Sequence, residues 1–276
     1  MGFSDDLFNT IKSCAKIALG WRPGELRRHN CNKPLLILAN GPSLNKIFEQ
    51  HGQSLTKFST MAVNFAANSP QFKEIKPYFY ILVDPHFFID KGQDENVDRL
   101  WENLNAAKWN LTVLVPRKFL GCKRVKSLKQ RVESINAIGA EGFGWFTKIV
   151  YSAKMAMPRP RNVLIPAIMS GIWLGFHQIV IVGADHSWMK TISVNDNNEV
   201  ISIQPHFYKE SKQEEIRVRH EYQGYRLHEI VGSFAVAFKS YHDIASFAAA
   251  KGISIINSTP ESFIDAFPRK PLSQLI

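Results

Sequence analysis

Short apolar runs alternate with longer segments of helical periodicity along most of the chain, and this rhythm limits the folds that it can adopt. The apolar runs lie at residues 35–39, 60–63, 78–83, 111–115, 178–182 and 253–256. Helical patterns lie at 44–50, 97–105, 147–156, 166–174 and 232–250. Strands that are apolar throughout are buried on both faces, and strands that alternate with helices form parallel sheets. The sequence therefore predicts an α/β fold, a Rossmann-like and mostly parallel sheet with helices on both faces.

The length and the hydrophobic content predict one large domain. With 276 residues, 45% of them hydrophobic, the chain can bury a full core, which we place in residues 31–276. Residues 1–30 are expected to form an amphipathic helix and a linker. The segment 187–226 is polar, contains "NDNNE" and interrupts the strand and helix rhythm. We interpret this segment as a lid insertion over a ligand cleft.

The charge balance favours an anionic partner. A formal net charge of +10 suits a nucleotide, a phosphorylated lipid, a membrane surface or a nucleic acid. The basic residues are scattered and form no recognisable nucleic-acid module, so nucleic acid is not the expected partner. The three cysteines are far apart, which argues against a disulfide framework or a structural zinc site. No signal peptide or membrane-spanning run is visible, so a cytoplasmic location is expected.

The N-terminal segment allows two interpretations. Leu7, Phe8 and Ile11 begin an apolar helical stripe that follows Asp5 and Asp6, and several arginines come after it. Such a helix either packs on the main domain or lies on the inner membrane as a peripheral anchor, with its basic end on anionic headgroups. The basic run 116–131 is either a solvated face or a contact for an anionic acceptor or for the membrane.

Four of the apolar runs end in small polar residues, at the sheet edge where open α/β folds bind ligands. Gly41 is expected to let the backbone approach a phosphate, with the amides of the next helix as a cradle. No GxGxxG or GxxxxGK[ST] follows the first run, so neither a dinucleotide fingerprint nor a P-loop is supported. The residues at these four ends are Asn40, Gly41, Pro42 and Ser43, then Asn64, then Asp84, and finally Gly183, Asp185 and His186.

Several blocks together resemble the bacterial CMP-sialic-acid-dependent sialyltransferases of lipo-oligosaccharide synthesis. They resemble equally a wider group of surface-polysaccharide and flagellin-glycosylation proteins that carry the same GPSL segment. The similarity extends from about residue 34 to residue 267 as short blocks. These blocks read "LILANGPSLNKI", "VNFAA", "VDPHFF", "IMSGIWLGFHQIVIVGADHSW" and "GISIINSTPESFIDAF".

The resemblance implies a CMP-activated sugar of the sialic-acid type as donor, a glycan or glycolipid as acceptor, inversion at the anomeric carbon, and no metal or other cofactor. It implies that Asn40, Gly41 and Ser43 contact the nucleotide phosphate and ribose, and that Asn64 contacts the donor. By the same resemblance, Ser170 and Gly171 hold the donor carboxylate and the cytidine side.

Three positions depart from the sialyltransferase pattern. Asp84 replaces an asparagine, Ala167 replaces an arginine, and the tyrosine expected after the "GAD" segment is missing. The departure at Asp84 leaves the donor sugar open. The candidates for the missing tyrosine are Tyr208, Tyr222 and Tyr225.

Transfer from a CMP-sugar requires hydrogen-bond donors to the leaving phosphate and a base for the acceptor hydroxyl. Histidine suits the base role because its ordinary pKa of about 6.5 lies near working pH. His228 lies between the lid and the last helix, where the sialyltransferases place their base. His206 and His186 are rivals, and one of them is a candidate for phosphate binding.

Two other functions stay open at this point. A magnesium-dependent pyrophosphokinase of the same superfamily would use Asp84 and Asp185 as a pair of metal ligands. A basic protein that binds membrane or nucleic acid would explain the charge without catalysis. The sequence also allows the protein to form a homo-oligomer.

Overall fold

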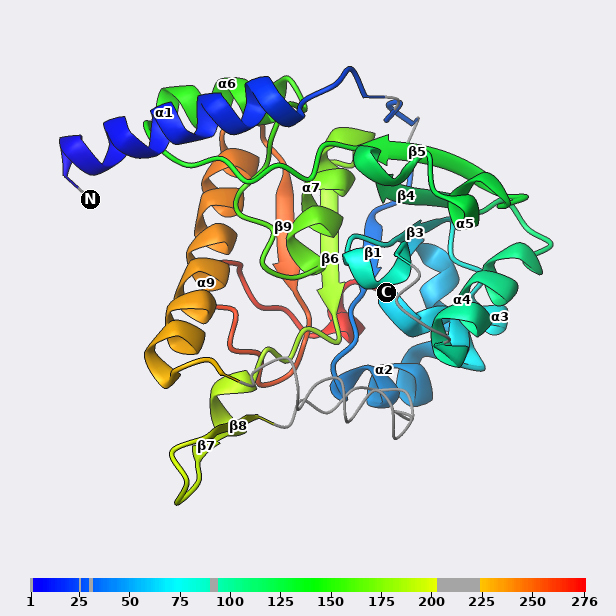
Figure 1. Ribbon diagram of the computed structural model, residues 1–276. Coiled ribbons are helices and arrows are strands. Elements are labelled where there is room, and N and C mark those ends of the chain that lie inside the picture. The colour runs from blue at the N-terminus through cyan, green and yellow to red at the C-terminus, as the bar shows by residue number, and fades with distance from the viewer. Residues whose placement is uncertain (1, 25, 30–31, 90–93, 203–223) are drawn as a thin grey trace.

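A parallel sheet of seven strands forms the centre of the molecule in the computed structural model, which describes residues 2–24, 26–29, 32–89, 94–202 and 224–276 (Figure 1). The strand order is β5-β4-β3-β2-β1-β6-β9, and each neighbouring pair is parallel. The Rossmann-like α/β fold predicted from the sequence is confirmed. The strands are β1 Leu35–Leu38, β2 Ser59–Val63, β3 Phe79–Ile81, β4 Thr112–Pro116, β5 Arg131–Ile135, β6 Gln178–Val182 and β9 Ser254–Asn257.

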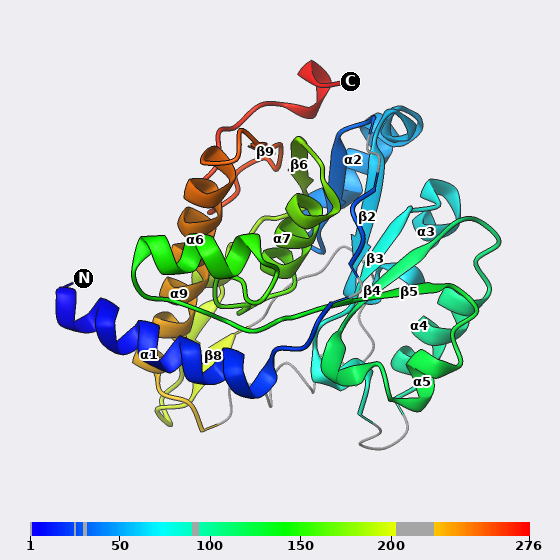
Figure 2. The same ribbon diagram turned by 90° about the horizontal axis from the view of Figure 1, so that it is seen from above.

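Helices cover both faces of the sheet, and the alternation of side chains along β1 shows why. Leu35 and Ile37 belong to one hydrophobic core, under α7 and α9, while Leu36 and Leu38 belong to a second core under α2 and α4. Figure 2 shows these two groups of helices on opposite sides. The helices are α1 Phe3–Gly20, α2 Ser43–His51, α3 Gln71–Ile75, α4 Glu95–Asn105, α5 Lys123–Lys126, α6 Gly144–Ser152, α7 Leu164–Leu174 and α9 Leu227–Ala249.

The chain changes direction across the sheet between β1 and β6. From β1 it builds outward through β2, β3, β4 and β5, and it then returns to add β6 and β9 on the other side of β1. Leu38 of β1 pairs in register with Ala62 of β2 and with Val182 of β6, so the carboxyl ends of these three strands lie level. Such a switch point is the usual ligand site of an open α/β sheet.

Several elements were missed in the sequence, among them the strands β5, β7 and β8. Strand β5 is an edge strand that carries Arg131 and the buried Glu133, which form an ion pair at 2.7 Å. Because it contains polar residues and follows directly on the basic run 116–131, β5 did not stand out as an apolar run. The antiparallel hairpin of β7 Ile192–Val194 and β8 Val200–Ser202 lies in the predicted lid. The rest of that lid, residues 203–223, is outside the described residues, so the lid and the domain limits stay predictions. No described helix is long and apolar enough to cross a membrane.

Helix α7 is buried along its whole length and packs closely against the sheet. A Cβ atom added at Gly171 would lie 2.6 Å from Leu35 Cδ2 and 3.0 Å from Ile179 Cδ1. Both neighbours are fully buried and have no free space to move into. The absence of a side chain at Gly171 therefore sets the distance between α7 and the strands β1 and β6.

We expect the Gly171→Ala variant to unfold at lower denaturant concentration than the wild type. The added methyl group overpacks the core, at a cost of about 1–3 kcal/mol in the free energy of unfolding. Gly232→Ala in α9 is the matched control, because a Cβ there meets nothing within 4 Å. The control should gain up to about 1 kcal/mol from helix propensity. Equal midpoints for the two variants in urea would contradict this packing role.

Candidate functional site

The loops that follow β1 and β6 are tied together at the switch point. The backbone N–H of Gly41 donates to the carbonyl of Gly183 at 2.7 Å. Ser43 Oγ donates to Asp185 Oδ2 at 2.8 Å, and the Ser43 N–H lies 3.3 Å from Oδ1 of the same carboxylate. Ser43 is the first residue of α2, so the Asp185 carboxylate lies at the positive end of that helix, where a negative charge is stabilising.

Gly41 allows a close contact within the protein. A Cβ atom there would lie 1.9 Å from Asp185 Oδ2 and 2.6 Å from the Gly183 carbonyl oxygen. The glycine therefore admits the Asp185 side chain to the start of α2, next to the exposed Pro42. The phosphate contact expected at Gly41 stays a prediction.

Asn40 and Asn64 follow neighbouring strands, each two positions beyond its member of the register pair of Leu38 and Ala62. The side-chain oxygen of each is buried and has no hydrogen-bond partner among the described residues. A buried polar atom left unpaired costs about 1–3 kcal/mol, so two of them at one edge indicate a place prepared for a ligand. Their amide groups suit hydroxyl, amine and phosphate groups, since an amide both donates and accepts.

The backbone at Asn64 is held in an unusual conformation. Its φ of 49° lies in the left-handed region, which asparagine tolerates better than most residues. The hydroxyl of Tyr80 donates to the Asn64 carbonyl and accepts the N–H of Ala67 at 2.8 Å. Burial raises the pKa of Tyr80, so this hydroxyl stays protonated and keeps donating. The Asn64 side chain is therefore positioned before any ligand binds.

The end of β9 adds polar groups that the sequence did not identify as site residues. Ser258 Oγ is buried and unpaired within the described structure, beside the carboxyl end of β6. Thr259 Oγ1 accepts the N–H of Ala184 at 3.0 Å, and Ser262 Oγ donates to the Ala184 carbonyl at 2.6 Å. The polar "NST" that ends the last apolar run was a signal of the same kind as those at β1 and β2.

Ser170 and Gly171 have no exposed surface at this edge. Ser170 is completely buried inside α7, and its Oγ has no partner among the described residues. Gly171 faces Leu35 and Ile179, as described above. Close packing accounts for the glycine without a ligand, and the donor contact implied by the resemblance stays a prediction.

Asp84 and Asp185 do not lie together. They follow β3 and β6, which are separated by β2 and β1, and three strand spacings amount to about 14 Å. Asp84 is exposed and accepts the N–H of His86 at 2.8 Å, while Asp185 binds Ser43. Each carboxylate therefore has its own partner in the described structure, and the magnesium pair expected for a pyrophosphokinase stays a prediction.

His186 belongs to a buried hydrogen-bond chain. Its Nε2 lies 2.6 Å from the Tyr241 hydroxyl, and that hydroxyl donates to Asn162 Oδ1 at 3.0 Å. Asn162 Oδ1 only accepts, so Tyr241 must accept from His186 and the proton of the neutral imidazole is on Nε2. The sequence gave no signal for Asn162 or Tyr241 as site residues.

The surroundings of His186 oppose its protonation. The ring is partly exposed, but it lies 4.2 Å from the Trp188 ring and 5.5 Å from the Tyr241 ring, centroid to centroid. Desolvation by these neighbours lowers the pKa of His186 to about 3. Burial also raises the pKa of Tyr241. Both groups are thus neutral at physiological pH.

Of the other candidate bases, His228 is not brought to His186. His228 is exposed in the first turn of α9, thirteen residues before Tyr241, a rise of about 20 Å along the helix axis. His206 lies outside the described residues, as do Tyr208 and Tyr222. Tyr225 is exposed just before α9.

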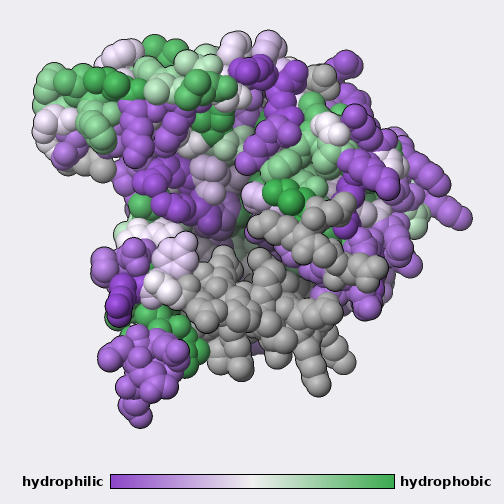
Figure 3. Space-filling model, in the orientation of Figure 1, coloured by the Kyte–Doolittle hydropathy of each residue, from purple (hydrophilic) through white to green (hydrophobic). Residues whose placement is uncertain are grey.

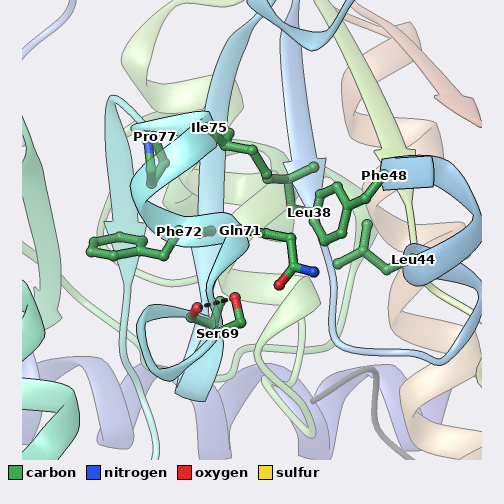
Figure 4. A pocket seen from close by; sticks show the side chains of 10 residues that line it. Leu38, Leu44, Phe48, Ser69, Gln71, Phe72, Ile75 and Pro77 are labelled. Atoms are coloured by element: carbon green, nitrogen blue, oxygen red, sulfur yellow. Dashed lines mark hydrogen bonds between the residues drawn. The ribbon is translucent and has the colours of Figure 1, made fainter. Parts of the chain in front are cut away.

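A small apolar hollow opens on the other face of the sheet, between α2 and α3 (Figure 4). The side chain of Gln71 extends toward Leu44 there, and Ser69 Oγ donates to the Ala66 carbonyl at 2.8 Å. The hollow adjoins the β1 loop through Leu38 and Leu44, but it lacks the unpaired polar groups of the switch point. We therefore place the candidate site at the strand ends. The apolar lining includes Leu38, Leu44, Phe48, Ala62, Phe72 and Ile75.

Comparison with known proteins finds a solved structure with a similar fold. No protein-family model matches the chain, and no curated protein matches it. The structure of a MAf glycosyltransferase from Magnetospirillum magneticum AMB-1 superposes with a TM-score of 0.54 at 12% sequence identity. The match covers 100% of this chain and 39% of that chain, so this chain spans well under half the length of its structural neighbour. The chain therefore has a fold similar to that of a bacterial glycosyltransferase.

We expect the neutral His186 to make stability depend on pH. Its pKa is about 3 in the folded state and about 6.5 in the unfolded state, so the unfolded chain binds more protons between these values. Stability is therefore full above pH 6.5 and falls as the pH drops toward 3, with a loss on the order of 1–2 kcal/mol at pH 5. Urea unfolding of the wild type at pH 7 and pH 5 measures this loss.

The His186→Gln variant should lose most of that pH dependence, since the titrating group is gone. His177→Gln is the control, because His177 is exposed and should leave the wild-type pH dependence unchanged. If His186→Gln loses as much stability between pH 7 and pH 5 as the wild type does, His186 is not held neutral by the fold.

Proposed function

We propose that the chain is a glycosyltransferase whose donor is a CMP-activated sugar of the sialic-acid type. The observation that carries this proposal is the pair of buried side-chain oxygens of Asn40 and Asn64, which lack hydrogen-bond partners among the described residues and lie just beyond the ends of adjacent strands. The similarity of fold to a MAf glycosyltransferase supports the reaction class. The CMP specificity rests on the sequence blocks around these asparagines, which resemble those of the sialyltransferases.

In this proposal the two amides bind the ribose and phosphate of CMP. Asp185 does not contact the phosphate but holds the β1 loop through Ser43, so that Asn40 is correctly placed. The unpaired hydroxyl of Ser258 lies on the β6 and β9 side of the same edge and is available to the sugar. Neutral hydrogen-bond donors of this kind stabilise a leaving phosphate without proton transfer.

The reaction is a direct displacement at the anomeric carbon. The oxygen of an acceptor hydroxyl forms the new bond to that carbon, and the bond to the CMP phosphate oxygen breaks with its electron pair leaving on CMP. A base accepts the acceptor proton. One displacement from the opposite face inverts the configuration, and the acceptor is a glycan or a glycolipid.

We assign the base to His228. A base must be unprotonated near pH 7 and must still bind a proton well, and a pKa of about 3 makes His186 a weak base. His228 is exposed at the start of α9, on the same side as the β7 and β8 hairpin (Figure 1). This assignment requires the sugar of the donor to extend from the strand ends toward the start of α9.

We expect CMP to raise the melting temperature of the protein, with or without magnesium, and UDP, GDP and ATP to have little effect. Ligand bound to the folded state at one hundred times its Kd stabilises by about 2.7 kcal/mol. The variants Asn40→Ala and Asn64→Ala should bind CMP about tenfold more weakly, since each loses one hydrogen bond. Thermal shift and isothermal titration calorimetry measure these effects.

Asn103→Ala is the matched control for the asparagine variants. Asn103 lies on α4, away from the switch point, and its side-chain amide donates to Asn68 Oδ1 at 3.2 Å. The affinity for CMP should therefore not change in this variant. If none of the tested nucleotides stabilises the protein, the proposal is wrong. If CMP still stabilises both asparagine variants, the donor is correctly identified but the binding site lies elsewhere.

We expect His228→Ala to lower turnover at least a hundredfold while leaving CMP affinity nearly intact, because a base acts on the acceptor. Release of CMP in the presence of acceptor measures turnover. Unchanged turnover would remove His228 as the base. His242→Ala is the control, since this exposed histidine pairs only with Asp265, at 3.1 Å.

A further inference from the structure

Helix α1 binds the rest of the protein through polar side chains. Ser13 Oγ donates to the Glu141 carbonyl and accepts the Glu141 N–H, both at 2.9 Å. Thr10 Oγ1 accepts the N–H of Phe143 at 3.0 Å. Ser13 and Ile17 are the residues that α1 buries. The inner face of this helix is therefore mostly polar.

The apolar face of α1 points outward, which is the reverse of a normal surface helix. Phe3 is 75% exposed, Phe8 65%, Ile11 61% and Leu19 80%. Leu7, at 43%, lies on the same stripe. An outward apolar stripe of this size on a helix marks an interaction surface.

Helix α6 extends this stripe into a platform. The two helices lie side by side at the end of the molecule opposite the carboxyl ends of the strands (Figure 1, Figure 2). The Phe3 ring lies 5.3 Å from the Phe143 ring, which stacks 6.4 Å from Trp145. Figure 3 shows the hydrophobic side chains gathered over both helices. We define the α1–α6 platform as Phe3, Leu7, Phe8, Ile11, Leu19, Trp145 and Ile149, all exposed.

Cationic side chains border the platform. Lys12 and Lys16 are exposed on one flank of the α1 stripe, and Lys148 is exposed between the two apolar residues of α6. Partial burial lowers the pKa of Lys16, and the positive charges of Lys12, Arg159 and Arg161 lower it further, against the opposing effect of Glu141. The border therefore attracts anions.

We propose that the α1–α6 platform docks on the surface of an anionic phospholipid bilayer. The apolar stripe, with its aromatic residues Phe3, Phe8 and Trp145, enters the headgroup and acyl boundary, and the lysines contact lipid phosphates. Each lysine near such a surface contributes about 1 kcal/mol. This inference does not depend on the proposed function.

The charge pattern favours a lipid surface over a second copy of the chain. Five cations lie on or near the border and outnumber the acidic residues there, which are Asp5 and Asp6 in the first turn of α1 and Glu141, already paired with Arg159 at 3.4 Å. Two platforms packed face to face would bring these positive charges together in a partly desolvated interface, which is unfavourable. Anionic headgroups remove that repulsion.

Sedimentation of the full chain with vesicles tests the proposal. We expect binding to vesicles of phosphatidylcholine with 30% phosphatidylglycerol and much weaker binding to phosphatidylcholine alone. The double variant Phe8→Ser and Ile11→Ser should bind at least tenfold more weakly, since two exposed apolar side chains are lost. Both positions are exposed, so the variant should fold; its control is Val194→Ser, at another exposed apolar site, on the β7 and β8 hairpin.

Two further measurements separate the alternatives. Lys12→Gln with Lys16→Gln should weaken binding to the anionic vesicles, whereas Lys190→Gln, at an exposed position beyond the carboxyl end of β6, should not. Vesicles should shift the tryptophan emission of the wild type to shorter wavelength, and Trp145→Phe should reduce that shift. Failure of the wild type to bind anionic vesicles overturns the proposal. Dimers in light scattering that Phe8→Ser and Ile11→Ser abolish would assign the platform to a second copy instead.

Discussion

The bond between Asp185 and Ser43 is the contact on which the candidate site depends. It joins the loops after β1 and β6, two strands that neighbour each other in the sheet but are about 140 residues apart in the sequence. The carboxylate also stabilises the first turn of α2. Glycine at position 41 makes the approach possible, because any side chain would occupy the same space. Asn40, immediately before that glycine, is positioned as a result.

The sequence predicted the sheet well because the central strands are buried on both faces. Such strands are apolar throughout, so β1, β2, β4 and β6 were visible as runs. Strand β5 was not predicted, because an edge strand retains polar residues such as Arg131. The hairpin of β7 and β8 escaped for the same reason, since it is exposed and its turn is made of polar residues.

The sequence was less informative about the site. Polar residues at strand ends drew attention to Asn40 and Asn64, whose side-chain oxygens are buried and unpaired among the described residues, while their contact with a donor stays a prediction. The sequence pattern could not show that Asp185 accepts a hydrogen bond from Ser43, because these residues lie far apart in the sequence. It also could not show which face of α1 is inward. Periodicity measures how amphipathic a helix is, but the hydrogen bonds of Thr10 and Ser13 decide its orientation.

The platform and the strand ends lie at opposite poles of the molecule (Figure 1). If the protein sits on a bilayer through α1 and α6, the candidate site stands away from the lipid by the diameter of a domain of this size, about 40–50 Å. A short group attached to a lipid of the same leaflet would not reach that height. Geometry would then favour ligands that approach from the aqueous side, such as the distal tip of a long saccharide.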